Sequence, residues 1–334
     1  MAITMKDVAR HAGVGLGTVS NYLSGKAKVS EHKSELIEKA IKELNYKFNS
    51  TAQALKTKKF MYIGVLIPAF TNNFVMSLLS ILEEELNENG YHMIVLEHGK
   101  REETFRHHVT HLINRVDGMI VFETQMKVKN IIEDSQIPTV IYDNYFMGYG
   151  SDQVGPNLLE ISKEATIALI KKNHTKIAFI ENIGKGVEEE NPIIKGYEKA
   201  FSQAGLKVDK SLIYEINREH KESMPEKISI LLDRNPDITA FVAFSYKQTV
   251  GIWSYLAQNH LLDKIYLLGY NCREISKLKY PNMCYVQINL EEVVRKLVYL
   301  LLKRVINFDH SVETITVGHR LVNENNIVWN YVNE

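Results

Sequence analysis

The sequence has few cysteines and no long apolar segment. Its two cysteines, Cys272 and Cys284, are too few and too widely spaced for a zinc knuckle or a redox motif, so we expect reduced thiols with a structural role. No run of about 18 apolar residues occurs, so the sequence predicts no membrane-spanning helix. Asp7 and Arg10 interrupt the N-terminal stretch that a signal peptide would need. We therefore expect a soluble, cytoplasmic protein without a membrane partner.

The sequence also lacks the motifs of common enzyme classes. No strand is followed by a Gly-x-Ser-x-Gly elbow, a Walker loop or a Gly-x-Gly-x-x-Gly turn, and Gly184-Lys185-Gly186 is too short to indicate one. His107 and His111 have the spacing of two metal ligands on a helix, but no cysteine or carboxylate motif accompanies them, which favours a solvated helix surface. We expect no enzyme activity, cofactor or metal. An enzyme or a pure ligand-binding protein is the remote alternative, and catalysis that survives deletion of residues 1–60 would indicate an enzyme.

The chain as a whole has no net charge, but its charges are unevenly distributed. The 334 residues contain 40 Lys and Arg and 40 Asp and Glu. Residues 1–60 contain 11 basic and 5 acidic side chains, a net charge of +6, and the rest of the chain carries −6. A basic segment releases counterions when it meets phosphates, which supplies most non-specific affinity for DNA. The distribution favours a DNA-binding N-terminal segment over a lysine-rich helical surface without a partner.

Residues 3–24 predict two short helices separated by a glycine turn. Thr4 followed by Asp7 is a helix-start signature, and Gly13 ends this helix. A second helix begins near Gly17. Two helices joined in this way form a helix-turn-helix, whose second helix fits the DNA major groove. The residues expected to face inward are Val8, Ala9 and Ala12 in the first helix and Val19, Tyr22 and Leu23 in the second.

A third helix completes the N-terminal bundle. It is capped by Ser30 and runs to about Asn45. Apolar residues at helical spacing form its inward face. These residues are Leu36, Ile37, Ala40, Ile41 and Leu44. Together the three helices predict a small all-α domain with its own core.

Beyond residue 60 the pattern changes to strands that alternate with helices, in a chain that is 45% apolar and long enough for two or three folded units. The first series of apolar runs covers 62–68, 93–96, 118–122 and 138–142, with helical stretches at 74–89 and 104–115. The second series covers 176–180, 212–216, 240–244 and 265–270. This alternation predicts an α/β region of two doubly wound parallel-sheet lobes with a cleft between them.

Five short segments of the N-terminal bundle resemble the LacI/GalR family of bacterial transcriptional regulators. Members of that family begin with Asp-Val-Ala, Ala-Gly-Val and Thr-Val-Ser and continue with Val-Ser and Leu-x-Tyr. These segments are 7–9, 12–14, 18–20, 29–30 and 44–46 in this chain. The resemblance covers nearly the whole chain and is strongest over residues 3–68. It implies a repressor with a lambda-repressor-like helix-turn-helix domain and an α/β domain that is similar to periplasmic binding proteins.

The resemblance also implies how the chain is divided. Residues 1–47 are expected to form the helix-turn-helix domain, 48–60 a hinge helix or linker, and 61–334 the effector-binding and dimerisation domain. The expected first lobe is about 61–157 plus 289–316, and the second is about 158–288 plus 317–334, so the chain crosses between them more than once. Ligands of open α/β sheets bind at the carboxyl ends of the strands, which line the cleft. The alternative is a cleft that is only a seam between lobes.

The segment 49–59 contains good helix formers but is too short to be a stable helix alone in water. In the family this segment is the hinge helix, and two copies in a dimer enter the DNA minor groove. The implied minor-groove contacts are Asn49, Ala52 and Leu55, with Leu55 as an apolar wedge between base pairs. The alternative is a flexible linker. Phe48 stands where relatives usually have proline, so we expect a less rigid start to this helix.

Family members read base edges with the two side chains before Thr-Val-Ser and the one after it, which correspond to Leu16, Gly17 and Asn21. Asn21 replaces the usual arginine. Arginine pairs with guanine, whereas asparagine pairs with adenine N6 and N7 and leucine contacts the thymine methyl group. We therefore expect A·T-leaning readout. The expected phosphate contacts are Thr4, Thr18, Ser20, Ser24, Lys28, Ser30 and Lys33.

The effector-binding positions depart from the family pattern. The matching residues are Phe70, Phe74, Asp143, Ile193, Tyr246 and Asn271. Ile193 replaces the arginine of sugar- and purine-responsive relatives, and Ser245-Tyr246 replaces an Asn-Asp pair. A sugar needs charged partners to compensate for its desolvation, and only Asp143 is retained. Three alternatives stay open: a less polar or partly aromatic effector that stacks on Phe74 or Tyr246, control by a co-regulator protein, or loss of control by a cleft ligand.

The geometry of DNA recognition predicts a homodimer. One three-helix domain reads only a few base pairs, whereas two domains on a twofold axis read a palindrome at higher affinity. The sequence contains no C-terminal leucine heptads of the kind that make some relatives tetramers. The dimer surface is expected on first-lobe helices, around residues 74–86 and near Ile113. We expect a repressor that binds a palindromic operator in double-stranded DNA and responds to a small molecule.

Overall fold

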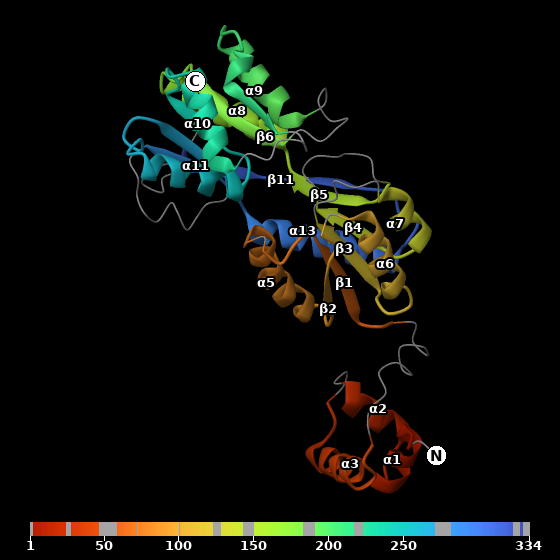
Figure 1. The fold of residues 1–334 in the computed structure, drawn as a ribbon. Helices are drawn as coiled ribbons and strands as arrows, with labels where there is room; N and C mark the ends of the chain where they lie inside the picture. The colour runs from red at the N-terminus through yellow and green to blue at the C-terminus, as the bar shows by residue number, and fades with distance from the viewer. Residues whose placement is uncertain are drawn as a thin grey trace. The chain divides into compact units, whose positions relative to one another are not determined.

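The computed structural model describes residues 3–24, 28–46, 59–71, 73–99, 101–122, 128–142, 150–182, 191–216, 223–270, 282–322 and 328–329. The chain divides into two compact units, Met1–Met61 and Tyr62–Glu334, which are called the head and the body below (Figure 1). Among the described residues, no helix combines the length and the apolar composition that a membrane crossing requires.

The head contains the three predicted helices, α1 (Met5–Ala12), α2 (Leu16–Ser24) and α3 (Glu31–Glu43). Thr4 is the N-cap of α1, and its backbone N–H donates a hydrogen bond to the Asp7 carboxylate at 3.0 Å. Gly13 ends α1 with φ of +64°, a left-handed conformation that glycine adopts without a steric penalty. The predicted start and end of the first helix are thus confirmed.

The head has its own apolar core, as predicted. Val8, Val19 and Ile37 are fully buried, one from each helix. The remaining predicted core residues are Ala9, Ala12 and Ala40, which are buried, and Tyr22, Leu23, Ile41 and Leu44, which are partly buried against them. The prediction for Leu36 is wrong, because this side chain is 37% exposed. Leu36 precedes Ile37 by one residue, about 100° around the helix, which turns it away from the core.

The prediction of Ser30 as the cap of the third helix is correct in position only. Ser30 is the N-cap residue of α3 and has extended backbone angles, but its side chain makes no capping hydrogen bond. Its hydroxyl therefore does not serve the helix in this structure, although a side-chain cap is the usual reason for serine at this position.

The body contains two β-sheets. The six-stranded sheet comprises β1 (Tyr62–Ile67), β2 (His92–Glu97), β3 (Gly118–Phe122), β4 (Thr139–Tyr142), β5 (Asp152–Pro156) and β11 (Thr314–Val317), in the order β11-β5-β4-β3-β1-β2. All of its pairings are parallel. We call this sheet and its helices the first lobe.

The second lobe is built on a seven-stranded sheet. Its strands are β6 (Ile177–Asn182), β7 (Ile213–Ile216), β8 (Ala240–Val242), β9 (Tyr266–Tyr270), β10 (Met283–Ile288), β12 (His319–Val322) and β13 (Val328–Trp329), in the order β13-β12-β10-β9-β8-β6-β7. The parallel prediction holds for β6 to β10, but β12 pairs antiparallel with both β10 and β13. The chain enters β12 from the first lobe, whereas it leaves β10 toward the first lobe, so these two neighbouring strands run in opposite directions.

Helices cover both faces of each sheet, as the near-continuous apolar strands require. Ile63, Val65 and Ile67 of β1 pack toward α5 (Asn73–Glu88) and α13 (Leu290–Ile306), while Leu66 packs toward the opposite helices. Those helices are α6 (Glu102–Leu112) and α7 (Lys129–Ser135) (Figure 1). The second lobe contains α8 (Leu158–Lys171), α9 (Pro192–Gln203), α10 (Met224–Arg234) and α11 (Tyr246–Gln258), with a 3₁₀ turn at Lys210–Leu212.

In the described part of the chain, three connections join the two lobes. β5 leads through Asn157 to α8, β10 leads through Asn289 to α13, and β11 leads through Gly318 to β12. The first two connections share one design, because each asparagine side chain accepts a hydrogen bond from the backbone N–H three residues later, at 3.2 Å and 3.1 Å. A capped helix therefore begins where the chain changes lobe, which fixes the direction of the helix at the crossing.

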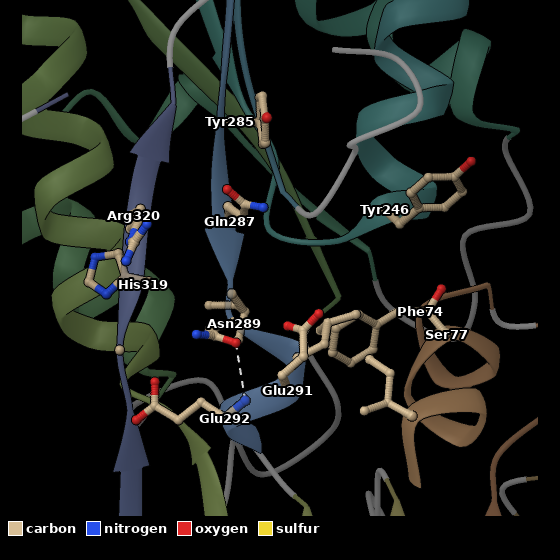
Figure 2. Close-up of a pocket in the computed structure, with 14 residues that line it drawn as sticks. Phe74, Ser77, Tyr246, Tyr285, Gln287, Asn289, Glu291, Glu292, His319 and Arg320 are labelled. Atoms are coloured by element: carbon tan, nitrogen blue, oxygen red, sulfur yellow. Dashed lines mark hydrogen bonds between the residues drawn. The ribbon is translucent and has the colours of Figure 1, made fainter. Parts of the chain in front are cut away.

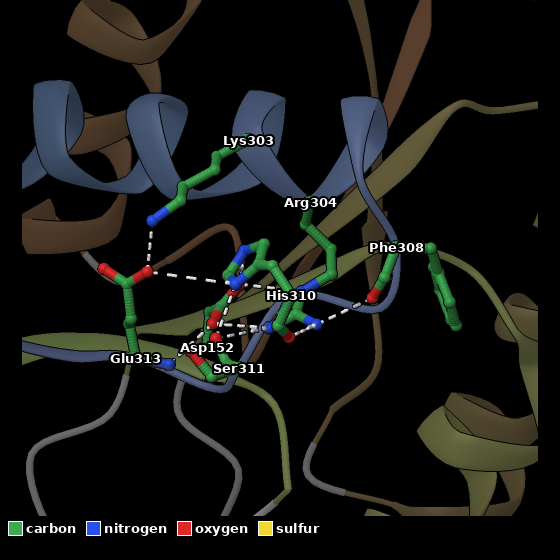
Figure 3. Close-up of polar contacts among 7 residues, drawn as sticks. All are labelled: Asp152, Lys303, Arg304, Phe308, His310, Ser311 and Glu313. Carbon is green, nitrogen blue, oxygen red and sulfur yellow. Dashed lines mark hydrogen bonds and ion pairs between the residues drawn. The ribbon is translucent and has the colours of Figure 1, made fainter.

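A buried ion pair anchors the far end of α13 (Figure 3). The Arg304 guanidinium donates to both carboxylate oxygens of Asp152 at 2.8 Å and 2.9 Å, and Asp152 is fully buried. The same guanidinium donates to the carbonyls of Phe308 and His310, and the Glu313 N–H donates to Asp152 at 2.8 Å. The cluster therefore ties together the end of α13, the start of β5 and the segment before β11.

Candidate functional site

The expected base-reading residues lie on the exposed side of α2. Leu16 begins the helix and is 41% exposed, and Gly17 and Asn21 are also exposed, whereas Val19 is fully buried against the head core. No residue of α2 carries a carboxylate. The helix therefore presents an apolar side chain and an amide, which are groups that read base edges. It carries no acidic group that would repel phosphate.

Most of the expected phosphate contacts lie on the surface of the head. Those with described side chains are Thr4, Lys28, Ser30 and Lys33, which are exposed, and Thr18 and Ser20, which are partly exposed. The Thr4 hydroxyl is already engaged, because it donates to the Asp7 carboxylate at 2.6 Å. The side chain of Ser24 and the hinge residues Asn49, Ala52 and Leu55 lie outside the described residues.

Two polar contacts brace α3 against the other helices. The Tyr22 hydroxyl of α2 donates to the Glu38 carboxylate at 2.6 Å, and this hydrogen bond raises the pKa of Tyr22. The His11 ring of α1 lies 2.7 Å from the Glu43 carboxylate, and this contact lowers the pKa of Glu43. Both contacts join α3 to the helix-turn-helix, so they hold the exposed face of α2 in place.

A cavity of about 630 Å³ adjoins the connections between the two lobes (Figure 2). The first lobe contributes side chains of α5 and the first turn of α13, and the second lobe contributes side chains of α11, β10 and β12. The lining residues are Phe74, Ser77, Ile81, Tyr246, Tyr285, Gln287, Ile288, Asn289, Leu290, Glu291, Glu292, Gly318, His319 and Arg320. A ligand of this cavity would touch both lobes and two of the connections that join them.

The structure brings two of the expected effector-binding residues together in this cavity, Phe74 from the first lobe and Tyr246 from the second. Phe70 is 49% exposed and does not line the cavity, and its N–H donates to Glu97 at 2.9 Å. Ile193 is fully buried in the apolar core rather than on the cavity wall. Asp143 and Asn271 lie outside the described residues.

Packing holds the Phe74 ring, and hydrogen bonds hold the start of α11, which carries Tyr246. The Phe74 ring lies 5.8 Å from that of Tyr142, which in turn lies 5.6 Å from that of Phe122. Tyr246 opens α11, whose cap is Ser245. Two residues later, the Gln248 side chain accepts a hydrogen bond from the Phe244 N–H at 3.1 Å and donates one to the Ile180 carbonyl at 2.7 Å. The start of α11 is thereby fixed to the second sheet.

Several lining residues were not predicted, chiefly Tyr285, Gln287, Glu291, Glu292, His319 and Arg320. Tyr285 and Gln287 are two residues apart in β10 and therefore point to one face of the sheet. The lobe boundaries that the resemblance implied, at about residues 288 and 317, placed Gln287 and His319 close to crossings between the lobes. The acidic first turn of α13 is a normal helix-start pattern and does not by itself indicate a binding site.

Comparisons with known proteins agree with this arrangement. Residues 4–49 match the family described as bacterial regulatory proteins, lacI family. Residues 61–266 match the family described as periplasmic binding proteins and sugar binding domain of LacI family. The two matches correspond to the head and to most of the body, so they confirm the predicted fold class.

Relatives match the chain from end to end. The HTH-type transcriptional repressor PurR of Vibrio campbellii is 29% identical over 332 residues, which cover 97% of this chain and 98% of that protein. The ribose operon repressor of Escherichia coli K12 is 30% identical over 316 residues, which cover 90% of this chain and 93% of that protein. Both relatives are named as repressors.

Solved structures share the fold. The Lac repressor dimer bound to operator and the anti-inducer ONPF superposes with a TM-score of 0.76 at 18% identity, covering 97% of this chain and 98% of that one. The complex of the transcriptional regulator CelR with cellobiose superposes with a TM-score of 0.68 at 21% identity, covering 96% and 98%. The two family matches and the 30% identity to the ribose operon repressor show that the chain belongs to the LacI family of bacterial regulatory proteins.

Proposed function

We propose that the protein is a cytoplasmic repressor of transcription that binds a palindromic operator as a homodimer, with an affinity that depends on a small molecule in the cavity. One observation carries the proposal: a single chain combines the exposed, carboxylate-free face of α2 with a cavity of about 630 Å³ lined by two lobes. The repressor names of the relatives support it. This function requires no catalysis, cofactor or metal.

The proposal divides the chain into residues 1–47 for DNA reading, 48–60 for a hinge in the minor groove, and 61–334 for effector binding and dimerisation. Asn49, Ala52 and Leu55 would make the minor-groove contacts. Exposed apolar side chains on the first lobe support a dimer surface there, since Met76 of α5 and Ile113 after α6 are 41% and 38% exposed.

Base reading would use Leu16, Gly17 and Asn21. The amide of Asn21 suits adenine N6 and N7, and the exposed side chain of Leu16 suits the thymine methyl group. Gly17 presents no side chain, so the backbone of α2 approaches the groove closely there. The phosphate contacts would come from exposed hydroxyl and lysine side chains of the head, which would fix the position of α2 in the groove.

The effector would act on the relative orientation of the lobes. Phe74 and Tyr246 belong to different lobes and line the same cavity, so a ligand between them favours one separation of the lobes over others. Aromatic walls without the family's arginine favour a less polar effector than a sugar. Coupling of this kind changes DNA affinity by about 5- to 150-fold, or about 1–3 kcal/mol.

Two measurements test this function. First, the full-length protein is used to select bound fragments from genomic DNA, and the expected result is a set of palindromic sites whose binding weakens as salt rises. Second, the affinity for the selected operator is titrated with a broad metabolite library. A shift that disappears in Phe74→Ala or Tyr246→Ala supports control through the cavity, whereas no shift with any metabolite favours control by a co-regulator protein.

A further inference from the structure

The wall of the cavity combines carboxylates with aromatic rings. Glu291 and Glu292 line it from the first turn of α13, and the rings of Phe74, Tyr246 and Tyr285 line the same space (Figure 2). Within the described ranges, neither carboxylate forms an ion pair with a lysine, arginine or histidine.

The basic groups of the cavity lie elsewhere on its wall. His319 already contacts the Glu164 carboxylate at 2.9 Å. Arg320 is exposed on β12 and lies beside His319, across the β10–α13 connection from Phe74 (Figure 2). The position at which sugar-responsive relatives supply an arginine is Ile193, which is buried in the core. On the Phe74 side, the Glu291 carboxylate forms no ion pair among the described residues, although the Arg295 Nε one turn later donates to the Glu291 backbone carbonyl at 3.4 Å.

We infer that the effector of this cavity is an organic cation, an amine or quaternary ammonium group carried on an apolar or aromatic body. The inference rests on the proposed function of the cavity as the effector site. A cation is attracted both by a carboxylate and by the electron-rich faces of aromatic rings, whereas an anion is repelled by both. A neutral polyol can donate hydrogen bonds to the carboxylates but supplies no opposite charge.

The size of the cavity distinguishes an organic cation from a metal ion. Its volume of about 630 Å³ lies within the range of small-molecule pockets, about 300–1,000 Å³. Among the described residues, no three histidine, cysteine, aspartate or glutamate side chains are arranged to hold a metal ion. The aromatic rings of Phe74 and Tyr246 would instead contact the body of an organic ligand, with its charged group directed to Glu291.

Three probes of similar size and different charge test the inference on the full-length chain. Phenethylamine is the cation, phenethyl alcohol the neutral probe and phenylacetate the anion, and binding is measured by calorimetry. We expect phenethylamine to bind at least about tenfold more tightly than the alcohol, a difference of about 1.4 kcal/mol. Glu291→Gln should remove most of this preference. Glu84→Gln, which changes an exposed carboxylate of α5 outside the cavity, should preserve it.

The outcomes separate this inference from the proposed function. Equal or tighter binding of the alcohol or phenylacetate, abolished in Phe74→Ala, overturns the organic cation but keeps the cavity as a ligand site. Failure of phenethylamine, benzyltrimethylammonium and tetramethylammonium to bind overturns it as well. If a cation binds with the expected preference but neither it nor any metabolite alters operator affinity, the inference on ligand charge holds and the effector function fails. Matching thermal unfolding of Glu291→Gln and the wild type excludes misfolding.

Discussion

Asn21 is the residue at which the exposed face of α2 departs from the arginine of relatives, so it is the sharpest test of readout. Asn21→Arg should shift the preferred base from adenine to guanine at one position of each half-site, because arginine pairs with guanine O6 and N7. The discrimination involved is about 1–3 kcal/mol. Selection of sites from a random DNA library measures the change.

Lys42→Arg is the matched control for Asn21→Arg, since it also places an arginine on the exposed surface of the head but outside α2. It should leave the preferred site unchanged. If Asn21→Arg also leaves the preferred site unchanged, Asn21 does not contact a base edge.

Gly196 determines how closely two helices of the second lobe approach. A Cβ atom at Gly196 of α9 would lie 2.3 Å from the Leu159 carbonyl oxygen and 2.7 Å from the Ser162 Cβ of α8. Gly196→Ala should therefore lower the free energy of unfolding by about 1–3 kcal/mol, as overpacking does. Gly318→Ala is the control, because a Cβ there meets nothing within 4 Å. Chemical denaturation measures both, and equal stability of Gly196→Ala and the wild type would show that the helices can separate freely.

At the scale of elements, the Asp152–Arg304 pair holds three segments of the first lobe together. Asp152→Asn removes the charge but keeps the shape, and it leaves a buried guanidinium without its counter-charge. Breaking a buried pair in this way costs about 3–5 kcal/mol. Glu102→Gln is the comparison, because it breaks the exposed Arg106 pair at 3.3 Å, which contributes about 0.3–0.5 kcal/mol. Similar denaturation midpoints for the two variants would refute the anchoring role.

The start of α1 predicts how the head responds to acid. Hydrogen bonds from the Thr4 hydroxyl and the Thr4 N–H lower the pKa of Asp7 in the folded head. A lowered pKa in the folded state stabilises the fold above the unfolded pKa of about 3.9, and this contribution is lost as the pH falls through the folded pKa. Asp7→Asn should therefore show a smaller loss of head stability between neutral and acidic pH, measured by thermal unfolding. Glu35→Gln, at an exposed position of α3, serves as control.

The elements were predictable where periodicity and helix ends agree. The helix Met5–Ala12 has the predicted bounds, because Thr4 caps it and Gly13 ends it. Leu36 was assigned to the core because it follows the helical spacing of the other apolar residues, but at 37% exposure it lies at the edge of the buried face of α3. Periodicity therefore located elements more reliably than it located single side chains at the edge of a face.

At the scale of the whole molecule, strand direction and the lining of the cavity depend on how the two lobes are arranged, which local sequence patterns do not predict. The antiparallel orientation of β12 follows from its arrival out of the first lobe, about which its four residues carry no signal. Phe74 and Tyr246 were predicted for the cavity from the family pattern. Glu291 and Gln287 were not, because their place on the wall depends on how β10 meets α13.

The net charge of +6 in residues 1–60 predicts that the affinity for DNA falls as the salt concentration rises. The steepness of this fall depends on how many copies of the chain bind one operator. Each phosphate contact contributes about one unit to the slope of log affinity against log salt. If two heads bind one operator, Lys33→Ala removes two contacts and the slope should fall by about two units, whereas a single bound head would lose about one. Lys264→Ala, an exposed lysine of the body, should leave the slope unchanged. Affinities for the selected operator across a salt series measure the slopes, and a loss of only one unit for Lys33→Ala would contradict the homodimer.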